Sequence, residues 1–240
     1  MPKPLLLIAG PSGVGKTTLV ENLCRHFDNV EPVVSITTRE KRPGEVEARE
    51  YHFVTLEEFE RRRDAGLLLE WARFRNIYHG MMRTSVSDIQ WRNHYPVRAI
   101  DPSGIDNIES AGVKCRVVFL DAISDDELMR RLLRRSGKRH EAPDWDDLHG
   151  RLRNAGEVER PWCTKRLEEE RLKPPNERNF WFILSLDHLT TLRRAAWCFG
   201  LPTEDLPSHN FKQFRLLERA PYYSRRRGGP FPPRPDSPNI

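Results

Sequence analysis

The segment GPSGVGKTT, residues 10–18, constrains the fold of this chain more than any other feature. Gly10, Gly15, Lys16 and Thr17 satisfy the spacing G-x-x-x-x-G-K-[ST]. Glycines let the backbone curl so that successive N–H groups face the oxygens of a phosphate chain. In such a loop the lysine reaches the terminal phosphates and the threonine hydroxyl binds Mg²⁺. The segment, called the P-loop below, therefore predicts a nucleotide-phosphate site.

The residues beside the P-loop support this interpretation. The apolar run LLLIA, residues 5–9, is typical of a buried strand, and the segment 17–27 has apolar residues at helical spacing. A strand, a loop and a helix in this order place a bound anion at a helix N-terminus. The residues expected to bind the nucleotide are Gly10, Ser12, Gly13, Val14, Gly15, Lys16, Thr17 and Thr18, with Thr17 as the metal ligand. GTPases, motor ATPases and small-molecule kinases share this loop, so it does not identify the phosphate acceptor.

Further apolar runs alternate with helical patterns along the chain. The runs lie at 31–36, 96–100, 115–120 and 180–186, and the helical patterns lie at 55–66, 124–135 and 144–162. This alternation is typical of an α/β domain in which helices flank a doubly wound, mostly parallel sheet. A length of 240 residues predicts one such core with an appendage, which we place at 1–205 and 206–240.

The net charge of +5 lies mostly in the appendage. Residues 219–240 hold five arginines and one aspartate and so contribute +4 of it. The basic, Pro- and Arg-rich appendage is predicted to be disordered. It could serve as a solubilising tail, or bind RNA, an acidic surface or an SH3-like groove. We expect no nucleic-acid partner for the rest of the chain, and the oligomeric state stays open.

The cysteines and the apolar runs indicate the compartment. Four cysteines lie far apart without a C-x-x-C pair, which predicts reduced thiols and no zinc site. The apolar runs are too short to cross a membrane, and residues 2–10 lead directly into the P-loop, which a cleaved signal peptide could not do. We therefore expect a cytoplasmic protein without a membrane partner.

A second informative stretch is SITTREKRPGEVEAREYHFV, residues 35–54. Arg39, Arg42 and Tyr51 could converge on a second phosphate, because an arginine fork contacts a phosphate through two N–H groups and a tyrosine hydroxyl adds a donor. The alternative interpretation is a solvated, turn-rich charged loop around RPGE.

Five stretches together resemble the guanylate kinase family: GPSGVGKTT, S-I-TTR, RPGEV, Y-H-F-V and LLLEWARF, in this order. The similarity continues without a gap from the P-loop to residue 104, is looser to residue 151 and is a trace to residue 190. It implies transfer of the γ-phosphate of ATP to GMP or dGMP with Mg²⁺. It also implies a core with an inserted monophosphate-binding lobe, at about 35–97, and a mobile helical lid, at about 134–160.

The resemblance also assigns roles in the acceptor site. These are Arg39, Arg42 and Tyr51 for the phosphate, Glu45 for orienting the arginines, Ser35 and Glu70 for the base, and Asp101 near the acceptor and the metal. The chemistry agrees for Glu70, since guanine presents N1–H and an N2 amine as adjacent donors and one carboxylate can accept from both. In the lid, the resemblance implies that Arg131, Arg135 and Arg151 close over the phosphates and stabilise the charge on the transferring group. Their neighbours Arg130 and Arg134 fit an exposed basic helix instead.

Three acceptor-site positions depart from the family's usual residues. His79 stands where a second phosphate-binding tyrosine is usual, Met81 replaces a Ser or Thr that touches the base, and Ala99 replaces an acid. A register shift around 78–81 would instead return Tyr78 to the site. In the ungapped register each lost hydrogen bond removes roughly 1–3 kcal/mol of discrimination, which predicts weaker or redirected guanine selectivity.

Two other functions stay open from the sequence alone. One is a kinase on the same scaffold with an altered acceptor, such as another or modified nucleotide or a sugar phosphate. The other is a guanylate-kinase-like binding module that has lost catalysis. The P-loop and the lid arginines argue against the second, because a binding module does not need a triphosphate site.

Overall fold

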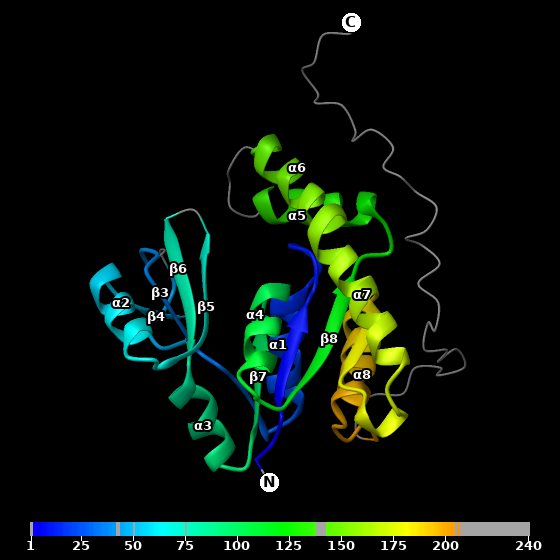
Figure 1. Cartoon of the computed structure of the whole chain (residues 1–240). Helices are drawn as coiled ribbons and strands as arrows, with labels where there is room; N and C mark the ends of the chain where they lie inside the picture. The colour runs from blue at the N-terminus through cyan, green and yellow to red at the C-terminus, as the bar shows by residue number, and fades with distance from the viewer. Residues whose placement is uncertain are drawn as a thin grey trace, which may run out of the picture.

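Two sheets and the helices around them make up the fold, as Figure 1 shows. The computed structural model describes residues 2–41, 44–49, 51–74, 76–137, 143–204 and 206. The predicted extension from residue 207 onward and Arg42 lie outside these residues. Among the described helices, none is long and apolar enough to cross a membrane.

The central sheet has five parallel strands in the order β2-β7-β1-β8-β9. They are β1 (Leu5–Ala9), β2 (Val30–Pro32), β7 (Tyr95–Ala99), β8 (Cys115–Asp121) and β9 (Phe180–Leu184). Every residue of β1 is fully buried, because helices cover both faces of a doubly wound sheet and leave no polar face. The predicted doubly wound, mostly parallel architecture is therefore confirmed.

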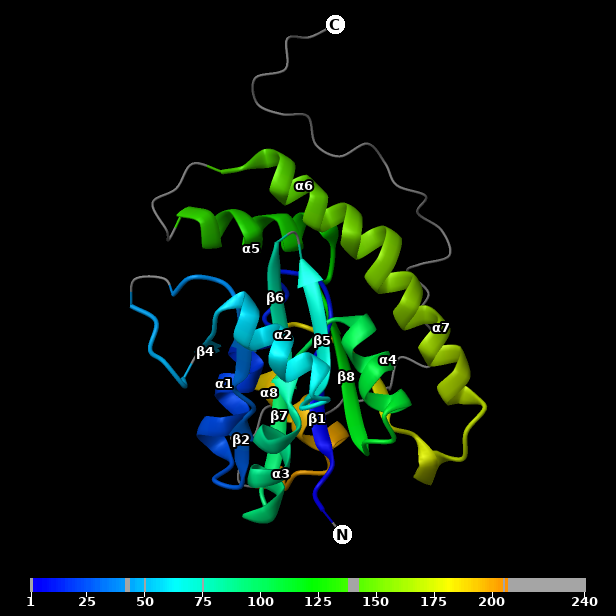
Figure 2. The same cartoon turned by 60° about the vertical axis from the view of Figure 1, so that its left-hand side comes forward.

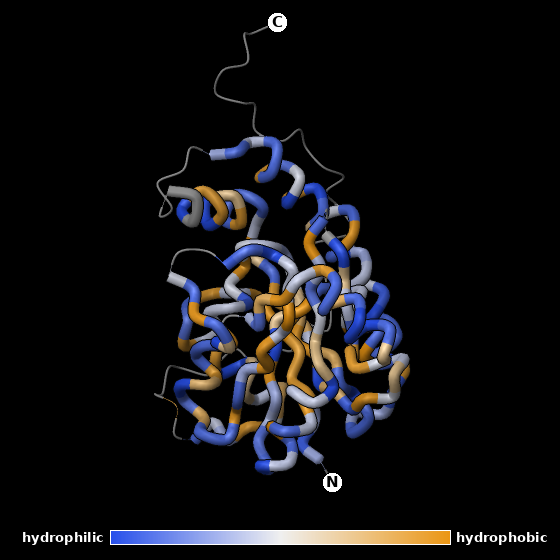
Figure 3. Tube along the Cα trace, turned by 90° about the vertical axis from the view of Figure 1, so that its left-hand side faces the viewer, coloured by the Kyte–Doolittle hydropathy of each residue, from blue (hydrophilic) through white to orange (hydrophobic). Residues whose placement is uncertain are grey.

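Helices cover the central sheet from both sides. They are α1 (Lys16–His26) and α8 (His188–Phe199) on one face, and α3 (Arg83–Trp91), α4 (Pro102–Ser110) and α7 (Arg160–Arg171) on the other. Leu19 and Leu23 of α1 pack with Phe199 of α8, and Ile105 of α4 packs with Cys163 of α7. Figure 3 shows the hydrophobic segments gathered in the interior of this core.

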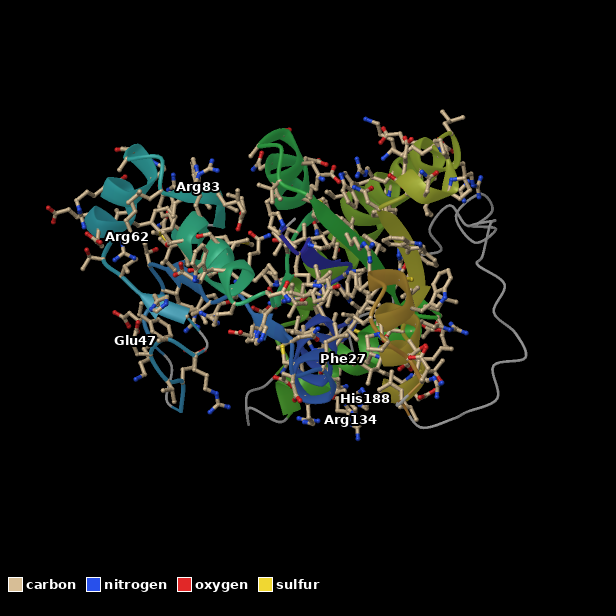
Figure 4. All side chains as sticks on the ribbon, turned by 90° about the horizontal axis from the view of Figure 1, so that it is seen from below. Phe27, Glu47, Arg62, Arg83, Arg134 and His188 are labelled. Carbon is tan, nitrogen blue, oxygen red and sulfur yellow. The ribbon has the colours of Figure 1, made fainter. Side chains whose placement is uncertain are left out.

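A smaller lobe projects from the core at the left of Figure 1. Its mixed sheet has the order β4-β3-β6-β5, and its strands are β3 (Ser35–Thr37), β4 (Tyr51–Phe53), β5 (Leu68–Phe74) and β6 (Ile77–Met82). Helix α2 (Leu56–Asp64) covers one face, where Phe59 packs on Ile36 and Leu68. In Figure 4 the labelled Arg62 and Glu47 lie on this lobe, away from Phe27 of the core.

One strand predicted from the sequence is two strands in the structure. The apolar run 31–36 divides into β2 and β3, which belong to different sheets. Between them the N–H of Val33 still donates to the carbonyl oxygen of Val97 at 2.9 Å, after which the chain leaves the central sheet. This connection is where the lobe joins the core.

Helices α5 (Asp125–Gly137) and α6 (Trp145–Asn154) carry the residues for which a lid was predicted, and are called the lid helices below. A π-helical turn, η1 (Ala155–Glu159), continues α6 into α7, and Figure 2 shows this run arching over the core. The helical pattern predicted over 144–162 is thus helical throughout, although it contains a π turn and extends to Arg171. Short π-helical turns inside α-helices are frequent at functional sites.

Candidate active site

The P-loop joins the carboxyl end of β1 to the first turn of α1. Gly15 is the N-cap residue of α1 in the left-handed conformation, with φ 108°. Gly10 has φ 130°, and a Cβ there would lie 1.9 Å from the carbonyl oxygen of Leu120, so no side chain fits. The Nζ of Lys16 donates to the carbonyl oxygens of Gly10 and Pro11, the latter at 3.2 Å. Because the unpaired N–H groups and positive dipole end of α1 meet at this loop, it suits a chain of phosphates.

Two arginines from the lid helices contact the P-loop. The Nη1 of Arg151 on α6 donates to Ser12 Oγ at 2.6 Å, while its Nε pairs with Asp147 at 2.7 Å. The Nη1 of Arg131 on α5 donates to the carbonyl oxygen of Val14 at 3.0 Å. The side chain of Arg135, the third predicted lid arginine, lies outside the described residues. Arg131 and Arg151 are therefore brought together at the P-loop from two separate helices.

Ser185, directly after β9, holds Arg131 in place. Its Oγ donates to the carbonyl oxygen of Val14 at 2.9 Å, and it accepts from Arg131 Nη1 at 2.9 Å. Arg131 Nη2 also donates to the carbonyl oxygen of Ser185 at 3.1 Å, and its Nε pairs with Glu127 at 2.7 Å. These contacts fix the guanidinium against the back of the P-loop.

A pocket, called the central pocket below, opens between the central sheet and the lobe. Its lining residues are Lys16, Ser35, Tyr51, Glu70, Ala72, His79, Arg98, Ala99, Ile100, Asp101, Ser103 and Gly104. Six of them are residues for which the sequence predicted a role in a site: Lys16, Ser35, Tyr51, Glu70, His79 and Asp101. Side chains from the P-loop and the lobe thus face a single cavity.

Glu70 lies deep in this pocket on β5. A Cβ on Gly104 of α4 would lie 3.3 Å from its Oε2, so the carboxyl group packs against the start of that helix. Burial raises the pKa of Glu70 to about 7, the charge of Arg98 lowers it and that of Asp101 raises it. The group is therefore close to half ionised near neutral pH, and in its ionised form it can accept two N–H donors.

Tyr51 also lines the pocket, and Arg39 lies beside its ring. The Arg39 guanidinium lies 5.6 Å from the ring centroid of Tyr51, and its Nη2 bonds both oxygens of Glu45, at 2.8 and 3.0 Å. Glu45 thus holds the guanidinium of Arg39 through both of its carboxylate oxygens. Ser35, almost fully buried, is paired with Tyr51 across β3 and β4.

The register of β6 decides between Tyr78 and His79. His79 is opposite Ala72 of β5, both line the central pocket, and its ring lies 5.6 Å from that of Tyr51. Tyr78 points to the other face, where its ring lies 5.3 Å from that of Phe59. Tyr78, for which substrate binding was predicted, is therefore not brought into the central pocket, because adjacent residues of a strand face opposite sides. Burial and the charges of Arg98 and Arg39 lower the pKa of His79.

Met81 and Ala99 contribute little polarity to the pocket. Met81 pairs with Glu70 in the lobe sheet but is fully buried among core residues such as Leu69 and Val86. Ala99 lines the central pocket with a methyl group only. The polar contacts that other residues could make at these two positions are absent.

Two charged residues near the site were not predicted. Arg98 lines the central pocket, and an arginine inside the apolar run PVRAI was a signal that could have identified it. Glu159 is buried in the π turn, where burial raises its pKa and the charge of Lys16 lowers it. Within the described part of the chain its Oε2 has no hydrogen-bond partner. Its sequence context, GEVERPW, carries no comparable signal.

The doubly wound sheet, the P-loop and the helical lid define a P-loop kinase fold. The family model "Guanylate kinase" matches residues 1–146. The guanylate kinase of Aromatoleum aromaticum is 36% identical over 163 residues, which are 61% of this chain and 79% of that protein. The guanylate kinase of Corynebacterium glutamicum is 30% identical over 196 residues, which are 80% of this chain and 91% of that protein. This chain belongs to the guanylate kinase family.

A solved structure has the same fold. The crystal structure of guanylate kinase from Anaplasma phagocytophilum aligns with a TM-score of 0.59 at 23% identity, over 83% of this chain and 85% of that one. The family predicted from the sequence motifs is thus confirmed by sequence relatives, and the fold by this structure.

Proposed function

We propose that this protein transfers the γ-phosphate of ATP to GMP or dGMP, giving GDP or dGDP. Family membership supports a phosphotransferase of this kind. The observation that carries the proposal is the central pocket, which joins Lys16 at the P-loop to Glu70 and Tyr51 on the lobe. A donor phosphate on the P-loop and an acceptor in the lobe would therefore meet in one cavity, as direct transfer requires.

The P-loop residues 10–18 would hold the donor. The start of α1 supplies N–H groups for the phosphates, and Lys16 would leave its backbone partners to contact the β- and γ-phosphates. Thr17 is exposed at this point and offers a hydroxyl oxygen. No group of three His, Cys, Asp or Glu that could hold a metal occurs among the residues that the structure describes. This donor set fits Mg²⁺, which takes few protein oxygens and binds nucleotide phosphates, whose negative charge it offsets.

The lobe would hold the acceptor. Arg39, oriented by Glu45, and the hydroxyl of Tyr51 would bind its phosphate together with Arg42. Ser35 and the ionised Glu70 would bind the base, since a carboxylate accepts from both N1–H and the N2 amine of guanine. Adenine presents no such pair of donors, so Glu70 favours guanine.

Lid arginines would stabilise the transferring group. Arg131 already contacts the P-loop backbone and Arg151 contacts Ser12, so both guanidinium groups lie beside the loop that would hold the phosphates. We assign Arg135 the same role from the sequence. The acceptor is a phosphate that needs no deprotonation, so positioning and charge stabilisation suffice and no general base is required.

We further propose one guanylate-kinase-like domain over 1–205, with the monophosphate-binding lobe at about 35–97 and the lid at about 134–160. The lobe sheet from β3 to β6 lies within the range given for the lobe, and α6 lies within the range given for the lid. A cytoplasmic location fits the use of ATP and the four free cysteines.

The test is an ADP-release assay with ATP and Mg²⁺ against GMP, dGMP, AMP, CMP, UMP, dTMP and IMP. We expect turnover with GMP or dGMP well above the others. Turnover with a different acceptor would support the altered-acceptor kinase, for which His79, Met81 and Ala99 are the motivating residues. ATP binding without turnover of any acceptor would support the binding module. The family relationships favour neither alternative.

A further inference from the structure

Arg98 of β7 occupies a distinctive place in the central pocket. Its Nη1 donates to the carbonyl oxygen of Val33 at 3.0 Å, and its guanidinium carbon lies 5.6 Å from the ring centroid of Tyr51. The side chain is half-buried and lines the pocket. Within the described part of the chain, no carboxylate forms an ion pair with it. Arg98 therefore keeps N–H donors beside the pocket that the described carboxylates do not occupy.

The groups facing Arg98 come from every element around the pocket. The acidic groups are Glu70 of β5 and Asp101 at the start of α4. The basic and aromatic groups are Lys16 of α1, Arg39 after β3, Tyr51 of β4 and His79 of β6. Arg98 and Arg39 lie at equal distances, 5.6 Å, from the Tyr51 ring centroid. The Tyr51 ring thus has two arginines beside it, and the pocket that it lines also contains the carboxyl group of Glu70.

Building on the proposed function, we propose that Arg98 is a specificity-determining residue that binds a phosphate oxygen of the acceptor nucleotide, while its charge favours the ionised form of the base-binding Glu70. The guanidinium group of Arg98 can serve the phosphate and the base from one position. Its remaining N–H donors lie beside the Tyr51 ring, where the acceptor phosphate would bind, and its positive charge acts on the Glu70 carboxylate.

The neighbouring His79 explains why this cation matters. Burial and the charges of Arg98 and Arg39 lower the pKa of His79, so its ring is neutral at neutral pH and carries no charge for a phosphate. Arg98 supplies the charge that His79 lacks. For Glu70, burial raises the pKa and Arg98 opposes this, so loss of Arg98 would raise the pKa further and leave more of the acid protonated.

The test compares Arg98→Met, which keeps an unbranched apolar stem but removes the guanidinium group and its charge, with Arg116→Met. Arg116 on β8 also donates through Nη1 to a backbone carbonyl oxygen, that of Phe199, but it does not line the central pocket. Steady-state kinetics with GMP are measured from pH 6 to 9 for both variants, Arg98→Lys and the unaltered protein, with melting temperatures as the fold control.

We expect Arg98→Met to raise the KM for GMP by about 10- to 100-fold with little change in the KM for ATP. The acidic limb of kcat/KM for GMP should move to higher pH in this variant and stay in place in Arg98→Lys, which keeps the charge. Ionisation of GMP itself is common to all the proteins, so it does not contribute to the difference.

Two other results would overturn the proposal in distinguishable ways. In the first, Arg98→Met lowers the melting temperature as Arg116→Met does but leaves the KM for GMP and the acidic limb of kcat/KM unchanged. Arg98 would then have only a structural role, through its hydrogen bond to the carbonyl oxygen of Val33. If the unaltered protein binds ATP but does not phosphorylate GMP, the proposed function fails, and the role of Arg98 fails with it.

Discussion

Arg130 and Arg131 are adjacent on α5 and both pair with Glu127, yet of the two it is Arg131 that reaches the P-loop. The Arg130 side chain is 72% exposed, whereas Arg131 donates to Val14 and Ser185. The two side chains leave the helix in directions about 100° apart, which follows from 3.6 residues per turn. One helix therefore offers a test residue and its control at neighbouring positions.

Arg131→Ala should lower kcat by about 100-fold or more, because it removes a guanidinium group that would stabilise the charge on the transferring phosphate. Arg130→Ala loses the same type of ion pair with Glu127 and should keep kcat within about twofold, since exposed pairs contribute little. Steady-state ADP release measures both variants. Equal losses in the two would contradict a direct role for Arg131.

Gly10→Ala should lower the free energy of unfolding of the protein by several kcal/mol. The added Cβ would meet the carbonyl oxygen of Leu120 at 1.9 Å with φ at 130°, so the backbone must move. Gly150→Ala in α6 places its Cβ in open space and should stabilise the protein by up to about 1 kcal/mol. Urea denaturation and ATP calorimetry distinguish the two; ATP binding unimpaired in Gly10→Ala would refute the steric argument.

The core around the P-loop could be predicted because its signals are local. The strand at 5–9, the loop and the helix from Lys16 are contiguous, and each follows from periodicity or glycine spacing. The lobe sheet could not be predicted in the same way. β3 and β4 have three residues each, too few for a pattern, and β3 pairs with a strand more than forty residues away.

Which side chain of β6 faces the central pocket depends on the pairing register of that strand, to within one residue. A shift of one position exchanges Tyr78 and His79 between the pocket and the α2 face, and the segment IYHG has no feature that fixes it. Arg98 was missed for another reason. The arginine inside the apolar run PVRAI is a local signal, but its place in the pocket depends on β7 lying beside the lobe, a tertiary relationship that the sequence pattern does not contain.

Activity with GMP should fall below about pH 7. Glu70 accepts from guanine when ionised, and its pKa of about 7 belongs to the free enzyme that kcat/KM reports. As pH decreases through 7 the carboxyl group takes up a proton and kcat/KM for GMP should drop toward tenfold per unit. Glu70→Gln should be about 10- to 100-fold less active at pH 8 and lack this limb. A limb that persists in Glu70→Gln would assign it to another group.

The same residue should make the folded state less stable at high pH. The pKa of Glu70 is raised from 4.5 when unfolded to about 7 when folded, so its protonated form is the one that folding favours. This contribution is complete below pH 4.5 and is lost as pH rises through 7. Glu70→Gln cannot ionise and should be about 1–3 kcal/mol more stable than the unaltered protein at pH 8, with little difference at pH 4.5. Urea unfolding at the two pH values checks this, and a Gln variant that is less stable at pH 8 would contradict it.

Lys16→Ala should abolish turnover and leave the fold intact. The Nζ of Lys16 donates to two carbonyl oxygens of the P-loop. Water can replace this donor at the exposed start of α1, so the melting temperature should change by only a few degrees. With ATP bound, the same ammonium group would balance charge on the β- and γ-phosphates, and its loss should lower kcat by at least about 100-fold. The control is Lys3→Ala, because Lys3 lies over the ring of Tyr95, outside the residues that line the central pocket. ADP release and thermal unfolding are measured on both variants, and substantial turnover by Lys16→Ala would remove the P-loop from the mechanism.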